Sequence, residues 1–265
     1  MLKQRVITAL VIAPIALALV FLAPDWLFTL AMLGIALVGA WEWSALAGKP
    51  ATSARYAMVA LFAACALMGW YLERSLPQAL LMYCLLALAW WIFSLAWIAV
   101  WRGEFSFEVK VLCGLLTLLP SLAAVVAVHA VSHWYLLILL LLTTSADIGA
   151  YFAGRAFGRR KLAPLVSPGK TWEGVVGGVA GAAVVAAVAS RWLPVPAWLF
   201  ILICVGVALL SVVGDLSESQ FKRLAGLKDS GGFFPGHGGV LDRVDSLTAA
   251  APLYWLGMYL LGLLT

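Results

Sequence analysis

The sequence predicts an all-α polytopic membrane protein, and three observations support this prediction. Of its 265 residues, 65% are hydrophobic and only 11% are charged, with a mean hydropathy of +1.04. Soluble domains have roughly 45–50% apolar and about 25% charged residues. The hydrophobic residues also gather into runs of about 20, the length that a helix needs to cross a bilayer. A soluble enzyme, a disordered chain and a secreted disulfide scaffold are therefore excluded.

Nine hydrophobic runs are expected to span the membrane: residues 6–24, 26–47, 56–73, 77–101, 109–128, 134–154, 173–193, 197–216 and 246–264. We expect one integral membrane domain over residues 1–265. Residues 1–130 are expected to form an apolar helical scaffold. Residues 134–265 carry two polar loops, at 155–172 and 217–245, and are expected to be the functional half.

The distribution of basic residues predicts the orientation. With the N-terminus in the cytoplasm and the C-terminus on the opposite side, 15 of the 17 Lys and Arg residues lie inside, and only Arg74 and Arg191 lie outside. Such a bias is typical of cytoplasmic loops. We therefore expect the two polar loops to face the cytoplasm. The net charge of +5 then reflects topology, and no nucleic-acid partner is expected.

A few polar side chains interrupt the apolar runs of the first half. For Glu42, near the cytoplasmic end of the second run, we expect snorkelling or a local partner. His129 and His133 lie four residues apart near the outer surface, and without a neighbouring carboxylate they are interpreted as interfacial rather than metal-binding. The cysteines have no ligand spacing and are expected to be small buried hydrophobes: Cys65, Cys84, Cys113 and Cys204.

Charge is densest between residues 215 and 245, where nine of 31 residues are charged. If the eighth run continues as a helix, Asp215, Ser219 and Lys222 share one face at i, i+4 and i+7, with Arg223 beside them. One face of this helix then carries a carboxylate, a hydroxyl and two cations.

A glycine-rich stretch follows, with six glycines among residues 226–239. Glycine permits close backbone approach and positive φ, as phosphate-binding loops require. Asp242 and Asp245 come next, three apart on one face of the last helix. Together with Asp215 they predict an oxygen-rich site for a hard divalent cation such as Mg²⁺ with a nucleotide polyphosphate.

The other polar loop follows Asp147, which lies inside the sixth apolar run. An ionisable residue at that depth costs several kcal/mol on insertion scales and is a functional candidate. Downstream, Ser167, Lys170 and Thr171 offer hydroxyls and a cation that suit an anionic head group. The Gly-Lys-Thr fragment is not a Walker A motif, because the upstream glycine is missing and no strand is expected before it.

Glycines in the seventh run form two overlapping GxxxG spacings: Gly174, Gly177, Gly178 and Gly181. This pattern is typical of close helix packing. The partner helix is expected either within the chain or across a homodimer.

The motifs resemble those of the phosphatidate cytidylyltransferase family, the CDP-diacylglycerol synthases. The resemblance lies in Ser219-Gln-Phe-Lys-Arg223, Lys228-Asp-Ser-Gly231, Pro235-Gly-His-Gly-Gly239 and Leu241-Asp-Arg-Val-Asp-Ser246, and in the stretch from Asp147 to Gly174. It implies Mg²⁺-dependent transfer of a cytidylyl group from CTP to phosphatidic acid, giving CDP-diacylglycerol and pyrophosphate. A second cation beside Mg²⁺ is left open.

The expected site residues fall into three overlapping groups. The catalytic group is Asp215, Ser219, Lys222, Arg223, Asp242 and Asp245. The substrate-binding group is Asp147, Ser167, Lys170, Thr171, Lys228, Asp229, His237 and Arg243. The metal ligands are Asp215, Asp242 and Asp245, of which Asp245 could instead orient Arg243.

Other functions are weighed against this one. In a cation transporter or channel, Asp147 and Asp215 would line the path, but the outer half of the spans is almost bare of titratable groups. A CDP-alcohol phosphotransferase usually has an aspartate array with DG…AR spacing, and no such array occurs here. A purely structural subunit would leave the glycine-and-charge loop without a purpose.

Overall fold

The computed structural model describes residues 13–48, 51–76, 78–101, 103–233 and 238–264, with the side chain of Trp101 left aside. Almost all of these residues are helical, which confirms the predicted fold class. After a short helix, Ala13–Leu22, come α2 Asp25–Leu46, α3 Thr52–Ser75, α4 Ala79–Ala96 with a π-helical turn Trp97–Trp101, α5 Phe107–Val131, α6 His133–Phe157, α7 Trp172–Ala189 with a 3-10 turn Ser190–Trp192, α8 Ala197–Leu224 and α9 Leu241–Leu260.

Seven helices among the described residues are long and apolar enough to cross a membrane, α2 to α8. They match the second to eighth expected spans. Residues 6–12 of the first expected span lie outside the described residues, and the rest of it forms the short helix Ala13–Leu22. The ninth expected span coincides with most of α9, whose first five residues carry three charges. The count of nine and the sides of the termini stay predictions.

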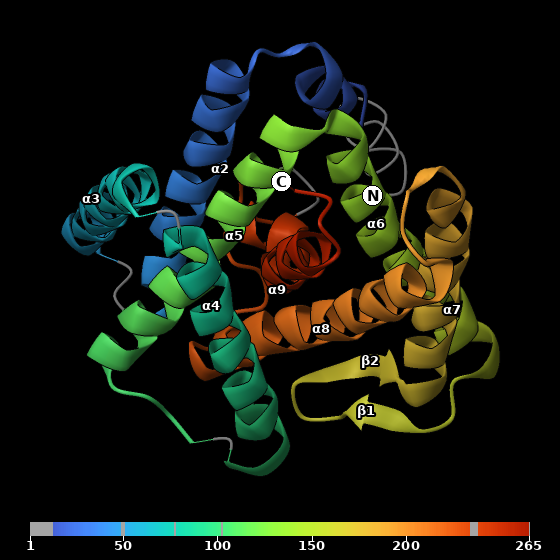
Figure 1. Ribbon diagram of the computed structural model, residues 1–265. Helices are drawn as coiled ribbons and strands as arrows, with labels where there is room; N and C mark the ends of the chain where they lie inside the picture. Colours follow the sequence, from blue (N-terminus) through green and yellow to red (C-terminus); the bar gives the residue numbers. More distant parts are fainter. Residues whose placement is uncertain (1–12, 49–50, 77, 102, 234–237, 265) are drawn as a thin grey trace.

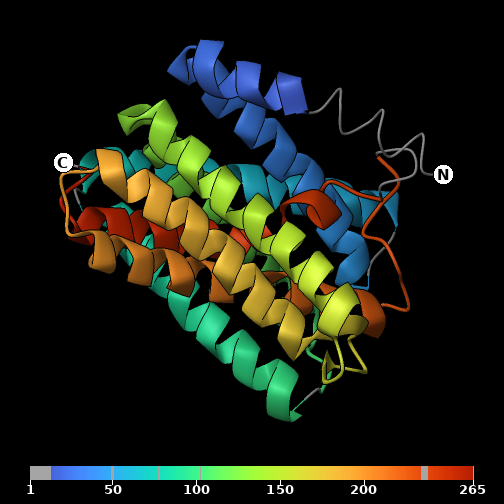
Figure 2. The ribbon, with the colours of Figure 1, turned by 90° about the vertical axis from the view of Figure 1, so that its right-hand side faces the viewer.

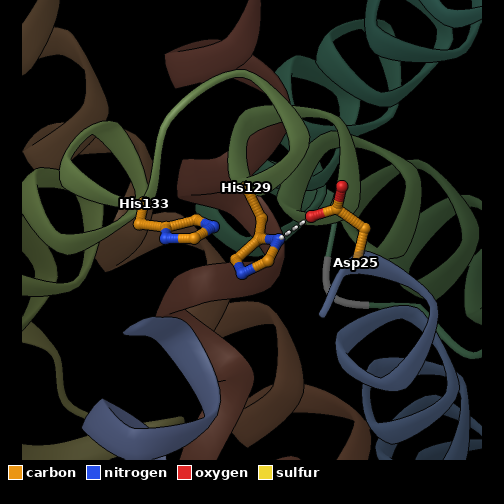
Figure 3. A group of neighbouring side chains, drawn as sticks. All are labelled: Asp25, His129 and His133. Carbon is orange, nitrogen blue, oxygen red and sulfur yellow. Dashed lines mark ion pairs between the residues drawn. The ribbon is translucent and has the colours of Figure 1, made fainter. Parts of the chain in front are cut away.

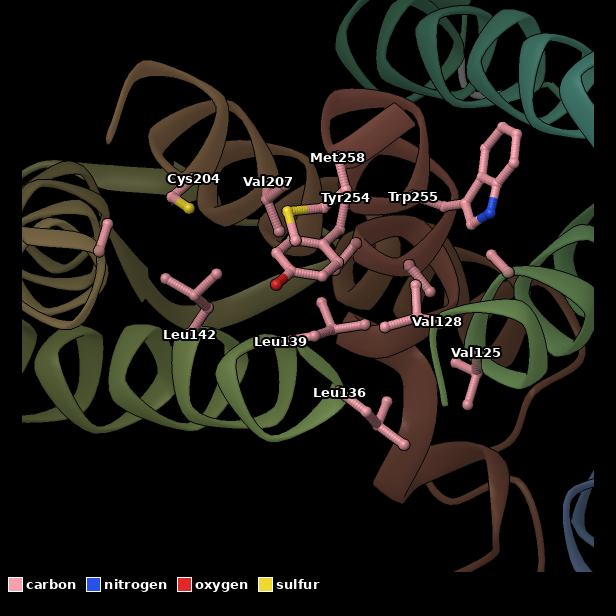
Figure 4. Packing of buried hydrophobic residues seen from close by; sticks show 14 of the residues in the cluster. Val125, Val128, Leu136, Leu139, Leu142, Cys204, Val207, Tyr254, Trp255 and Met258 are labelled. Atoms are coloured by element: carbon pink, nitrogen blue, oxygen red, sulfur yellow. The ribbon is translucent and has the colours of Figure 1, made fainter. Parts of the chain in front are cut away.

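Helix α9 occupies the centre of the bundle and contacts α4, α5, α6 and α8 (Figure 1). Its apolar residues pack into the main core, where Tyr254 is fully buried beside Leu139, Val207 and Met258 (Figure 4). The Tyr254 hydroxyl donates a hydrogen bond of 3.0 Å to the carbonyl of Tyr135. The four cysteines are free, as expected, and only Cys65 is not fully buried.

Helices α6 and α7 lie side by side along most of their length (Figure 2). A Cβ atom at Gly149 or Gly177 would collide with backbone of the opposite helix, and one at Gly181 would lie too close to the carbonyl of Ser145. The GxxxG pattern therefore serves packing within the chain. This contact fixes α6, which carries Asp147, against α7.

Two segments that were expected to be loops contain regular structure. Within 155–172, β1 Lys161–Ala163 and β2 Ser167–Thr171 form an antiparallel hairpin, with Lys161 opposite Thr171. Glu173 closes its base by accepting hydrogen bonds from the backbone N–H groups of Arg159 and Arg160. The expected loop 217–245 begins as helix, because α8 continues to Leu224. The polar face of that extension is buried by neighbouring elements, so its charges do not end the helix.

Candidate active site

A polar cavity of about 580 Å³ lies between α6, α7, the hairpin, α8 and α9. Its volume is in the range of small-molecule sites. Helix α7 contributes glycines and valines, and the other elements contribute charged and hydroxyl-bearing side chains, among them Asp147, Tyr151, Arg155, Ser167, Lys170, Thr171, Asp215, Asp242, Asp245 and Ser246. Seven of the predicted site residues therefore meet in one cavity, although they are spread over about 100 positions of the chain.

Asp215 lies on α8, facing this cavity. The Lys170 ammonium group, from β2, lies 2.6 Å from Oδ2 of Asp215, and Ser219 Oγ donates a hydrogen bond of 3.3 Å to its Oδ1. Gly214 is next to Asp215, and a Cβ there would come within 2.6 Å of the Asp245 carbonyl. The glycine thus lets α8 and α9 approach closely enough to bring Asp215 and Asp245 to the same cavity. Burial and the negative charge of Asp215 raise the pKa of Asp245.

Asp242 is held by several donors. Oδ1 accepts a hydrogen bond of 2.6 Å from Lys222 Nζ, which also lies 3.2 Å from Glu218 Oε1. Oδ2 accepts from the backbone N–H and the hydroxyl of Ser230 and from the N–H of Gly239. Burial alone would raise the pKa of Asp242, but Lys222 and these N–H groups outweigh it and lower the pKa. Asp242 therefore stays ionised and fastens the glycine-rich loop to α8.

Glu42 of α2 is part of the same network, which the sequence did not reveal. Its carboxylate is buried and accepts hydrogen bonds from the N–H groups of Val240 (3.0 Å) and Leu241 (2.9 Å), and it shares the one hydroxyl hydrogen of Ser230 (2.9 Å) with Asp242. A carboxylate at a helix N-terminus satisfies otherwise unpaired N–H groups and complements the helix dipole. The expected snorkelling or local partner is wrong, because the partners lie about 190 residues away in the chain.

The glycines of the loop make room for these carboxylates. A Cβ at Gly231 or Gly239 would collide with the carboxylate of Glu42. Gly238 has φ +82°, a conformation that other residues rarely adopt, and a Cβ there would meet Asp242. The pattern that was interpreted as a phosphate loop thus also serves to seat Glu42 and Asp242.

Other predicted site residues lie outside the polar cavity. Arg223 donates hydrogen bonds of 3.3 Å to the carbonyls of Val166 and Leu227, so it ties the hairpin to the end of α8. Lys228 and Asp229 are exposed and do not line the cavity in the described part of the chain. His237 lies outside the described residues. The roles expected for these four residues stay predictions.

Arg243 faces a second cavity. This space of about 470 Å³ lies between the helix Ala13–Leu22, α2, α5, α6 and α9, and its walls are apolar. Arg243 is its one charged lining residue among those described, while side chains such as Val20, Phe28 and Leu136 form its far end. The first turn of α9 therefore separates a polar cavity from an apolar one.

Comparison with known proteins decides the family. A model of the cytidylyltransferase family matches residues 3–261. The chain belongs to the cytidylyltransferase family. A phosphatidate cytidylyltransferase of Pseudomonas aeruginosa is 42% identical over 96% of both chains, and one of Haemophilus influenzae is 38% identical over 96% of this chain and 97% of its own. One of Brucella suis is 50% identical over 42% of each chain.

As a cytidylyltransferase, the chain is an enzyme of the nucleotidyltransferase class. This agrees with the resemblance found in the sequence motifs. Membership also sets aside the alternative of a cation transporter or channel, for which Asp147 and Asp215 would have lined the path. In this cytidylyltransferase both residues line a cavity at one end of the helical bundle.

Proposed function

We propose that the chain transfers a cytidylyl group from CTP to phosphatidic acid, giving CDP-diacylglycerol and pyrophosphate. The observation that carries this proposal is the pair of cavities on the two sides of the first turn of α9. A nucleotide triphosphate needs a polar site with cations, and a diacyl lipid needs apolar walls. The names of the relatives from P. aeruginosa and H. influenzae agree with this pair of substrates.

The polar cavity is proposed to take CTP with Mg²⁺. Asp147, Asp215 and Asp245 present carboxylate oxygens to one space, and this donor set fits a hard divalent cation. Asp242 also lines the space, but its two oxygens already accept four hydrogen bonds, so we propose it as the weaker ligand. Mg²⁺ bound there would neutralise charge on the triphosphate and make its α-phosphorus more electrophilic. A second cation beside it stays a prediction.

The apolar cavity is proposed to hold an acyl chain of the lipid substrate. Arg243 lines this cavity from the first turn of α9, and its guanidinium group would bind the phosphate of phosphatidic acid by paired hydrogen bonds. The reacting phosphate would then lie at the first turn of α9. The two substrates would then approach the first turn of α9 from opposite sides, and the lipid phosphate would reach past this turn to the α-phosphorus of CTP.

The reaction needs little covalent help from the protein. The phosphate of phosphatidic acid is a phosphate monoester and is already an anion at neutral pH, so no strong general base is needed. One of its oxygens attacks the α-phosphorus of CTP, the bond from that phosphorus to the bridging oxygen of the β-phosphate breaks, and the electron pair leaves with pyrophosphate. Lys170 and Arg155 are placed to offset the negative charge of the two polyanions.

Activity of the purified, full-length protein tests this function. With radiolabelled CTP, phosphatidic acid and Mg²⁺, we expect label in a lipid-extractable product and one pyrophosphate released per transfer. Omission of either substrate or of the metal should abolish both signals. Folded protein that gives no product with any divalent metal would overturn the proposal.

We further propose that the protein resides in the bacterial inner membrane with the polar cavity toward the cytoplasm, where CTP is made. The 15 basic residues expected on that side support this orientation. Lys170→Cys, in a variant whose four native cysteines are replaced by alanine, should react with a membrane-impermeant thiol reagent only from the cytoplasmic side.

A homodimer stays a prediction, which the mass of the protein in detergent would test.

A further inference from the structure

Three side chains that the proposed reaction does not use meet at the other end of the bundle. Asp25 begins α2, His129 lies near the end of α5, and His133 begins α6 (Figure 3). Along α6, His133 precedes Asp147 by 14 residues, or about 21 Å of helix. The group is therefore remote from the polar cavity.

Hydrogen-bond geometry defines the state of the His129 ring. Nε2 lies 3.0 Å from the carbonyl oxygen of Val20, which can only accept, so Nε2 carries a hydrogen. Nδ1 lies 3.3 Å from Oδ1 of Asp25. In neutral histidine with hydrogen on Nε2, Nδ1 has a bare lone pair, and a lone pair and a carboxylate repel each other. A proton or a metal ion between these two atoms would remove this repulsion.

The spacing of the ligand atoms suits a metal ion. One nitrogen or oxygen atom from each of the three side chains lies within 4.8 Å of the other two. Ligands at about 2.0–2.2 Å from a tetrahedral Zn²⁺ are about 3.3 Å apart, which matches the 3.3 Å between His129 and Asp25. The His133 nitrogen lies within 4.8 Å of the other two atoms, so its side chain would change rotamer to reach bonding distance of the same ion.

The surroundings hold the His129 ring in place for such a role. Phe28 stacks on one face of it, with ring centroids 3.7 Å apart, and His133 stacks on the other at 4.4 Å, so His133 would have to leave this stack to bind an ion in the plane of its ring. Its side chain is 1% exposed, whereas that of Asp25 is 68% exposed and reachable from solvent. A histidine that donates its other N–H to a backbone carbonyl has the usual arrangement around a metal ligand, because that bond fixes the tautomer.

We propose that Asp25, His129 and His133 bind a divalent transition metal of the Zn²⁺ class, with a fourth position left to water. Two imidazoles and one carboxylate are a ligand set that Zn²⁺ favours. The ion would join the beginning of α2, the end of α5 and the beginning of α6, and so would stabilise this end of the bundle. The sequence argued against a metal here because no carboxylate was near the histidines, and the fold supplies one from about 100 residues away.

Metal binding by the full-length protein in detergent tests the proposal, with excess Mg²⁺ present to occupy the carboxylates of the polar cavity. After removal of bound metal, we expect the protein to take up one Zn²⁺, and Co²⁺ as a probe should show the visible absorption of a tetrahedral site. Asp25→Asn and His133→Gln should each weaken binding by at least about tenfold. Zn²⁺ should raise the unfolding temperature of the unmodified protein and not that of the two variants.

Glu73→Gln is the matched control, because it removes a carboxylate from the end of α3 without touching the three proposed ligands. This variant should bind Zn²⁺ as the unmodified protein does. If the unmodified protein takes up no Zn²⁺, or if Asp25→Asn and His133→Gln bind it unchanged, the proposal is overturned and the contact is a protonated histidine paired with Asp25. His129→Ala is avoided as the main test, because loss of this buried, stacked ring would itself disturb folding.

Discussion

The polar and apolar cavities share one wall, the first turn of α9, but they have opposite chemistry. Asp242 and Asp245 line the first cavity, and Arg243 lines the second. Successive residues on a helix point about 100° apart, whereas residues three apart share a face. The order Asp-Arg-x-Asp therefore places carboxylates on one side of the helix and a guanidinium group on the other. The first residues of one helix thus line both a polar and an apolar cavity.

Loss of a carboxylate in the polar cavity should have the largest effect. Asp215→Asn removes a proposed metal ligand and the partner of Lys170, while the amide keeps the size of the side chain. We expect kcat to fall by about 10³-fold or more, as for other losses of transition-state charge stabilisation. Incorporation of labelled CTP into lipid measures this. Near-normal activity of Asp215→Asn would place the nucleotide elsewhere, and Glu73→Gln, at the opposite end of the bundle, should retain full activity.

A substitution of Glu42 tests whether the position of the first turn of α9 matters for activity, because Glu42 holds the N-terminus of this helix. Glu42→Gln leaves one acceptor oxygen where two served three donors. We expect a loss of about 1–3 kcal/mol in the free energy of unfolding, because a buried donor is left unpaired, and about a 10- to 100-fold fall in kcat. Thermal unfolding in detergent and the transfer assay give the two numbers. If neither changes, residues 1–130 are a passive scaffold after all.

A pair of variants separates the two substrates. Arg243→Gln should raise the KM for phosphatidic acid by about tenfold, since a charge-assisted hydrogen bond is worth roughly 1.5–3 kcal/mol, with little change in the KM for CTP. Lys170→Gln should do the reverse. Steady-state kinetics with each substrate varied in turn decides between the outcomes. If both variants change both KM values equally, the two substrates do not bind in separate cavities.

The smallest expected effect concerns the length of the lipid chain. Ala36 is buried and lines the apolar cavity, so Ala36→Phe should shorten the space. We expect a preference of a few-fold for shorter acyl chains, in line with the roughly 0.8 kcal/mol that each buried methylene contributes. Competition between phosphatidic acids of two chain lengths measures it. Ala36→Val is the control for crowding. If Ala36→Phe leaves the chain-length preference unchanged, the acyl chain does not bind in this cavity.

Much of the fold could be predicted from the sequence because membrane helices are local features. Hydrophobic runs of the right length identified α2 to α8, and the GxxxG spacing identified the close contact of α7. The hairpin was missed, because its strands are only three and five residues long and lie in a polar segment without alternating hydrophobicity. The sequence left open whether α8 continues to Leu224. Charged residues at helical spacing do not show whether neighbouring elements will bury them.

The site residues could likewise be predicted from the sequence only in part. Asp215, Asp242, Asp245 and Lys170 were identified by their residue types, their spacing and the resemblance of their motifs, and they meet in one cavity. The sequence by itself determined which helices form, the residue types available for chemistry and the family to which the chain belongs. Only the tertiary structure decided that Glu42 holds the start of α9, that Arg243 faces the apolar cavity and that Asp25 lies beside two histidines. Each of these depends on contacts between residues far apart in the chain, and such contacts arise from helix packing that no local pattern encodes.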